Sequence, residues 1–195
     1  DSWAPYVDLD QFTYHFGFHS TAAALHWITG LPAPTATLWT GQLLNGLACL
    51  VLYPLVFRMT GSRWASVWAV LLTGLLSPLP MKMVNWGRYT QLAGMVILPS
   101  AGWLTWELYE SEDRHWSLAA ILALVVSGLS LTHYRVLLFY VAFVIGLLLV
   151  YRGRTRQTRL LPLAASATAA VALSVPWLVN AFGSQMMAML GLQLT

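Results

Sequence analysis

The polar side chains able to do chemistry in this chain fall in three short segments that are far apart in the sequence. In chain order they are Asp8, Asp10, His15, His19, Asn85, Arg88, Tyr89, His133 and Arg135. Arginine beside tyrosine or histidine suits phosphate, because a guanidinium group binds phosphate oxygens through two parallel hydrogen bonds. A carboxylate can act as a general base toward an acceptor hydroxyl. If the segments meet, they predict group transfer from a phosphorylated lipid, with Asp8 and Asp10 as catalytic candidates and the other seven residues as substrate-binding candidates.

Each of these residue types also has a simpler interpretation. Arg88 and Arg135 are also expected to reach lipid headgroups, and the two aspartates to be solvated loop residues. The histidines fit buried or interfacial structural positions as well, or, at His133, a ligand of a haem or chlorophyll metal. Zinc is not indicated, because the histidine spacing matches no zinc pattern and the single cysteine, Cys49, is remote. No metal-ligating residue is therefore predicted.

The composition says which solvent must surround the elements that position these residues. Of the 195 residues, 58% are hydrophobic and 9% are charged, whereas soluble domains carry about 25% charged residues. A chain so poor in charge cannot cover itself with a surface compatible with water. Its net charge of +3 does not indicate nucleic acid, because the basic residues stand at the ends of apolar runs, where they orient membrane proteins. The expected partner is the lipid bilayer, not nucleic acid.

The expected fold is all-α, a polytopic transmembrane helix bundle with a short interfacial helix before the first crossing. A spanning helix needs about 20 apolar residues, and six segments approach this length: Pro34–Phe57, Trp64–Pro80, Tyr89–Leu108, Trp116–Thr132, Val136–Tyr151 and Leu160–Phe182. The earlier run Phe16–Ile28 is too short to cross and is amphipathic. This gives an outer loop and interfacial helix over 1–33, a six-helix module over 34–182, and an outer tail over 183–195.

The positions of the basic residues predict the orientation of this module. With the N-terminal segment outside the cell, the inner loops hold seven Arg, whereas Lys82, Arg88 and Arg135 stay outside. Cationic loops remain on the cytoplasmic side of a membrane. The predicted location is a cell inner or plasma membrane, crossed several times, with the N-terminal segment extracytoplasmic. In this arrangement all nine candidate residues face the same compartment.

Local signals refine the helix contacts. Small residues allow close approach of membrane helices and are predicted to do so at Gly41, Gly46, Gly74, Gly94 and Gly128. Ser62 after Gly61 indicates a tight connection between two helices. The segment Glu110–His115 is expected to be a solvated turn without chemistry.

The order of several motifs resembles the GT-C superfamily of membrane glycosyltransferases, which includes protein O-mannosyltransferases and aminoarabinose transferases. The motifs are Tyr-His-Phe-Gly-Phe-His at 14–19, Thr-Gly at 29–30, Arg-Met-Thr-Gly-Ser-Arg at 58–63 and Asn-Trp-Gly-Arg-Tyr at 85–89. The chain most resembles uncharacterised bacterial multi-spanning proteins of that architecture. Where relatives carry a Pro-Pro pair in the first outer loop, His15 and Phe16 stand here.

The resemblance implies a sugar donor carried on polyprenyl phosphate and a catalytic acid in the first outer loop. It places one further spanning helix before Asp1, and the acid close after that helix, near or upstream of Asp8 and Asp10. The resemblance is compatible with a divalent cation bound to this acid but does not require a cofactor. The alternative function is a non-catalytic subunit or assembly factor of a larger membrane complex, which keeps the same helix scaffold.

Overall fold

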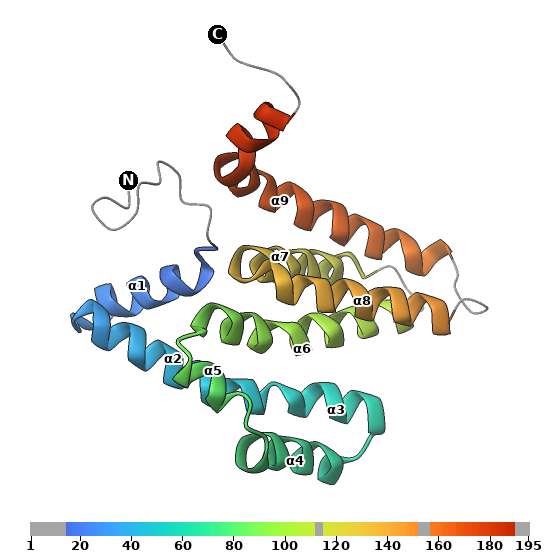
Figure 1. Ribbon diagram of the computed structural model, residues 1–195. Helices are drawn as coiled ribbons and strands as arrows, with labels where there is room; N and C mark the ends of the chain where they lie inside the picture. The colour runs from blue at the N-terminus through green and yellow to red at the C-terminus, as the bar shows by residue number, and fades with distance from the viewer. Residues whose placement is uncertain (1–14, 112–114, 152–156, 190–195) are drawn as a thin grey trace.

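The computed structural model describes residues 15–111, 115–151 and 157–189, and every regular element in them is a helix (Figure 1). The elements are α1 (Gly17–Thr29), α2 (Ala33–Leu50), α3 (Leu52–Thr60), α4 (Arg63–Leu71), the π-helical turn η1 (Leu72–Leu76), α5 (Met81–Asn85), α6 (Tyr89–Glu110), α7 (Trp116–Thr132), α8 (Tyr134–Val150) and α9 (Gln157–Met189). The prediction of an all-helical chain is confirmed for this part of the sequence.

Three helical stretches are long and apolar enough to cross a membrane. They are Ala33–Thr60, which joins α2 and α3, Arg63–Asn85, which runs from α4 to α5, and Leu160–Gly183 within α9. The helices α7 and α8 are also apolar but have 17 residues each, about 25 Å of helix. The helix α1 has 13 residues and is about 20 Å long, shorter than the roughly 30 Å hydrocarbon core of a bilayer.

The connection between the first two long stretches follows from two residues. Gly61 ends α3 with a positive φ of 66°, and its N–H donates to the Phe57 carbonyl at 2.8 Å. A side chain at this φ would be strained, so glycine is favoured here. Ser62 then caps α4, its hydroxyl accepting a hydrogen bond from the Ala65 N–H at 3.2 Å. The predicted tight connection is confirmed.

The connections between successive helices lie at two opposite ends of one bundle (Figure 1). One end, called here the α1 end, holds α1, the start of α6 and the junction of α7 with α8. The opposite end, called the α3–α4 end, holds the junction of α3 with α4, the last turn of α6, the start of α7 and the last turn of α8. Chain segments that the sequence assigned to the same side of a membrane therefore lie at the same end of the bundle.

The helix α6 lies at the centre of the bundle and packs against α1, α2, α3, α7, α8 and α9. Half of its 22 residues are buried. The largest buried cluster joins α6 with α7 and α8, and it includes Leu104, Leu108, Leu122 and Leu129. Because lipid tails are as apolar as leucine, close packing rather than water exclusion holds such helices together in a membrane. The centre of the bundle therefore fixes α7 and α8, whose junction carries two predicted site residues.

The glycines confirm part of the predicted close contacts. A Cβ built on Gly41 would lie 2.4 Å from the Tyr89 ring, and one on Gly94 would lie 3.1 Å from the Cβ atoms of His133 and Val136. A Cβ on Gly74 would lie 3.4 Å from the Cys49 sulfur, which is ordinary van der Waals contact.

For the other two glycines the prediction of close contact is wrong. A Cβ on Gly46 or on Gly128 would meet nothing within 4 Å, because neither faces another helix of the bundle. Helical spacing shows which residues share a face but not which face has a neighbour.

Candidate functional site

Two histidines from distant parts of the chain meet at the α1 end. His15 precedes α1 and His133 joins α7 to α8, and their ring centroids are 4.7 Å apart. The Tyr134 ring lies 4.9 Å from that of His15, and the Arg135 guanidinium lies 5.8 Å from the Tyr134 ring centroid. These four residues are called the histidine cluster. His15 and His133 are buried, whereas Tyr134 and Arg135 are exposed.

Backbone contacts hold the cluster in place. A Cβ on Gly17 would lie 2.4 Å from the Thr132 Oγ1 atom and 3.0 Å from its Cα, so the first turn of α1 lies directly on the last turn of α7. The next residue, His133, has an extended backbone, with φ −165° and ψ 102°, which ends α7 and starts α8. Its Nδ1 atom accepts a hydrogen bond from the Val136 N–H at 3.4 Å. His133 therefore caps α8 and also supplies a ring to the cluster.

Burial keeps the imidazoles of this site neutral at neutral pH. It is the main cause that lowers the pKa of His15 from 6.5 to about 4, and the charges of His133 and Arg135 add to the effect. Burial and Arg135 also lower the pKa of His133, and burial lowers that of the exposed His19 on α1. A neutral imidazole can both donate and accept hydrogen bonds. Because the imidazoles carry no charge, the positive charge of the cluster comes from Arg135.

Tyr89, a predicted substrate-binding residue, serves helix packing in this structure. Its ring stacks on that of Phe18 with centroids 5.3 Å apart and planes 19° apart. On its other side the ring lies against Gly41, where there is no space for a Cβ. Tyr89 thus fills the junction of α1, α2 and α6, next to the histidine cluster.

Asn85 and Arg88 form a second group near the start of α6. Both are exposed. The Arg88 guanidinium lies 5.0 Å from the Trp86 ring centroid, and the Lys82 ammonium lies 4.4 Å from the same ring. Such cation–π contacts are typical of basic residues at a membrane surface. Of the seven predicted substrate-binding residues, the structure places His15, His133 and Arg135 in the histidine cluster and Asn85 and Arg88 in this exposed group, whereas His19 and Tyr89 belong to neither.

Asp8 and Asp10, the predicted catalytic carboxylates, lie outside the described residues. Among the residues that the structure does describe, no three His, Cys, Asp or Glu side chains gather into a group able to hold a metal ion. The implied divalent cation has no fitting ligand set in that part of the chain.

The structure adds site residues that the sequence did not indicate. Tyr134 contacts His15 directly, and the Trp177 ring of α9 lies 6.3 Å from that of Phe16. The tyrosine was next to a predicted residue, so adjacency was an available signal. Nothing in the sequence connects Trp177 with Phe16, because the contact depends on how α9 crosses the bundle.

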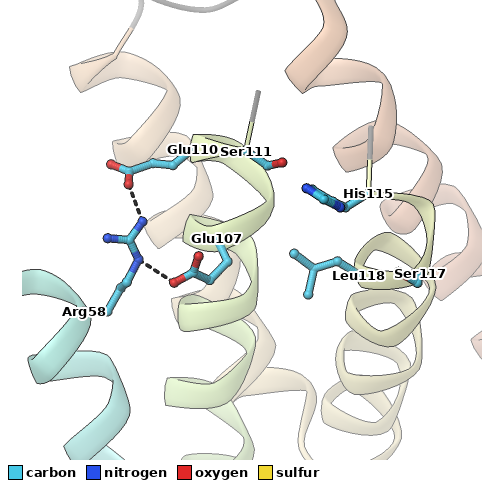
Figure 2. Close-up of a pocket in the computed structure, with 7 residues that line it drawn as sticks. All are labelled: Arg58, Glu107, Glu110, Ser111, His115, Ser117 and Leu118. Atoms are coloured by element: carbon cyan, nitrogen blue, oxygen red, sulfur yellow. Dashed lines mark hydrogen bonds and ion pairs between the residues drawn. The ribbon is translucent and has the colours of Figure 1, made fainter. Parts of the chain in front are cut away.

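A polar cavity of about 500 Å³ lies at the α3–α4 end (Figure 2). Arg58 of α3 points to two carboxylates of α6, forming an ion pair of 2.5 Å with Glu107 and a second one with Glu110. Ser111 and His115 lie on the other side of the cavity (Figure 2).

The segment Glu110–His115 was expected to be a solvated turn without chemistry, but Glu110 is the last residue of α6 and pairs with Arg58. Glu107 and Glu110 are three residues apart and so share one face of the helix. Because both carboxylates bind Arg58, they connect α3 to α6 and are not free to act as a base. The cavity is thus less suited to catalysis than the histidine cluster.

No protein-family model, no curated protein and no solved structure matches this chain.

Proposed function

We propose that this chain is the membrane module of a GT-C-like glycosyltransferase in a bacterial inner or plasma membrane. It moves a sugar from a polyprenyl-phosphate carrier to an acceptor at the extracytoplasmic face. The observation that carries the proposal is the convergence of His15, His133 and Tyr134 beside the charge of Arg135. These groups supply neutral hydrogen-bond donors and one permanent cation, which together suit the phosphate of the carrier.

The residues have distinct roles in this proposal. Arg135 neutralises the carrier phosphate, and the imidazoles of His15 and His133 hold its oxygens and the sugar hydroxyls. Asp8 or Asp10 removes the proton of the acceptor hydroxyl as it attacks the anomeric carbon, and the polyprenyl phosphate leaves with the bonding electrons. General-base help of this kind is typically worth about 10²–10⁴-fold in rate, and holding the reactants in position supplies the rest.

The proposal requires six crossings, with the α1 end outside the cell and α1 lying at the surface. It is supported by the sequence, in which the predicted inner loops hold seven Arg and the outer side holds three basic residues, Lys82, Arg88 and Arg135. A cysteine-labelling experiment tests it in a Cys49→Ala background. A membrane-impermeant maleimide should label Asn85→Cys in intact cells. It should label His115→Cys only after the cells are permeabilised. The opposite pattern would overturn the orientation.

Binding of a lipid phosphate tests the site itself. The probe is farnesyl phosphate, added to the full-length protein in lipid nanodiscs. Arg135→Gln should weaken binding by about tenfold or more, the usual loss when a hydrogen bond to a charged group is removed. Arg63→Gln is the matched control, because Arg63 is also exposed but lies at the α3–α4 end, and it should leave binding unchanged. Equal affinity of the wild type and Arg135→Gln would refute the phosphate site.

A second function, that of a non-catalytic subunit, is favoured by one observation. His15 and His133 are buried against each other, as expected of a packed helix junction. A transfer assay with full-length Asp8→Asn and Asp10→Asn separates the two functions. Loss of sugar transfer with farnesyl phosphate binding retained supports the enzyme. If both variants transfer sugar as well as the wild type, the base assignment is wrong, and if the wild type transfers none, the second function stands.

A further inference from the structure

An apolar groove runs along the bundle between α8 and α9, with α7 as its floor. It consists of a cavity of about 280 Å³ and a second one of about 190 Å³. The two share Val126 of α7, Tyr140 and Val141 of α8 and Ala167 of α9, so they form one continuous channel. Along α8 the lining extends from position 134 to position 145, which is about 16 Å at 1.5 Å per residue.

The polar side chains inside the groove are already hydrogen-bonded within the protein. The Ser130 and Ser174 hydroxyls lie 2.7 Å apart and join α7 to α9. The Tyr140 hydroxyl lies 2.8 Å from that of Thr105 on α6. The Ser166 hydroxyl donates to a carbonyl of its own helix at 2.8 Å. Because these groups have partners, the groove offers an occupant an apolar surface, which suits hydrocarbon rather than a polar ligand.

The mouth of the groove is continuous with the histidine cluster. Tyr134 lines the groove and also contacts the His15 ring, and Trp177 lines it and contacts the Phe16 ring. Arg135 follows Tyr134 in the chain, so a positive charge stands next to the apolar mouth. An apolar channel that opens beside a cation matches a molecule with a hydrocarbon chain and an anionic head.

We propose that this groove holds the hydrocarbon chain of a phosphorylated lipid whose phosphate lies at the histidine cluster. The inference rests on the proposed function and adds which helices receive the chain. The head remains near Arg135 at the bilayer surface, and the chain extends between α8 and α9 toward Ile145. Small side chains such as Ala167 make the groove wide enough for the hydrocarbon chain.

Photo-crosslinking tests the groove in the full-length protein in nanodiscs. The probe is a long-chain alkyl phosphate with a diazirine on its chain, and labelled peptides are identified by mass spectrometry. Labels are expected in α8 and α9 between Tyr134 and Leu178. An alcohol with the same chain and diazirine but no phosphate should label these helices much less, which distinguishes a phosphorylated lipid from ordinary bilayer chains. Equal labelling by both probes would overturn the proposal.

Matched substitutions separate the groove from the phosphate site. Ala167→Phe fills the groove, whereas Ala169→Phe makes the same change on an exposed residue of α9 that lines neither cavity. Ala167→Phe should weaken binding of the long-chain probe about tenfold, as when about two methylene groups lose their contacts. It should leave binding of butyl phosphate unchanged, and Ala169→Phe should alter neither.

The failure of the groove and the failure of the proposed function give different results. In one outcome Ala167→Phe binds the long-chain probe as well as the wild type does, while Arg135→Gln weakens binding of both the long-chain probe and butyl phosphate. The groove inference is then wrong and the phosphate site remains. If Arg135→Gln weakens neither probe, the proposed function fails, and the groove inference fails with it.

Discussion

The contact of Gly17 with Thr132 gives the sharpest prediction, because it places the first turn of α1 directly on the last turn of α7. In the Gly17→Ala variant the new methyl group would lie 2.4 Å from the Thr132 Oγ1 atom and 3.0 Å from its Cα. The first atom can rotate away, but the second belongs to the backbone of α7. The start of α1 must therefore move, and it takes the neighbouring His15 with it.

The expected cost follows from two opposing effects. Forcing an extra methyl group into a packed contact costs about 1–3 kcal/mol. Replacing glycine by alanine in a helix returns up to about 1 kcal/mol, and less at a first helical position. The net destabilisation is about 1–2 kcal/mol, which corresponds to a lower Tm by about 2–8 °C for a chain of this size.

Thermal unfolding in detergent, followed by circular dichroism, measures this cost. Modification of His15 by diethylpyrocarbonate, followed by mass spectrometry, reports the local effect. His15 is 3% exposed, so it should react slowly in the wild type and faster in Gly17→Ala. The control is Gly46→Ala, also within a helix, where a Cβ meets nothing within 4 Å. It should leave the Tm unchanged or raise it.

One pattern of results would refute this reasoning. If Gly17→Ala unfolds at the same temperature as Gly46→Ala, and His15 reacts no faster than in the wild type, then α1 is not held by this contact. The double variant Gly17→Ala with Thr132→Ala provides a further check. Removing the Oγ1 atom should recover part of the lost Tm, and no recovery would mean that the cost arises elsewhere.

Three further predictions concern acid stability, a buried hydrogen bond and the ion pairs. Folding lowers the pKa of His15 from 6.5 to about 4, so the unfolded chain binds more protons than the folded protein between pH 7 and pH 4. The free energy of unfolding should therefore fall by at most about 3 kcal/mol from pH 7 to pH 4. An unchanged Tm over this range would contradict a buried neutral imidazole. Tyr140→Phe removes the hydrogen bond to Thr105 and should cost about 0.5–1.5 kcal/mol in detergent unfolding, with Tyr53→Phe, an exposed tyrosine of α3, expected to cost nothing measurable. Arg58→Gln should lower the free energy of unfolding by about 1 kcal/mol or less, because the ion pairs are partly exposed. In 1 M salt the difference in stability between this variant and the wild type should be smaller. A difference that does not change with salt would argue against ion pairing.

The elements were largely predictable because each leaves a local signal. Apolar runs of helix length gave the helices, and the Gly61–Ser62 pair gave the turn between α3 and α4. That His15 and His133 lie at the same end was also predictable, as a consequence of the order of crossings, but their contact was not. Counting crossings decides at which end of a bundle a residue lies, and both histidines fall at the same end.

Contacts between faces of helices were not predictable from the sequence. Tyr89 was expected to bind substrate, and its packing against Phe18 depends on the angle at which α1 lies on α6. The ion pairs of Arg58 depend in the same way on how α3 lies beside α6. Charge and spacing limit which residues lie at each end, but the rotation of a helix about its own axis is set by all its neighbours together.

The contact between Gly17 and Thr132 also has a consequence for the order of assembly. Its two residues are among the most separated in sequence of any in the described contacts, and such long-range closures form late because the intervening chain must first be arranged. During synthesis α1 emerges before α7 exists, so it packs first against α2, the helix that follows it. Six later helices, α2 to α7, must be synthesised before α1 can make this contact, and the pair of histidines is completed only after that.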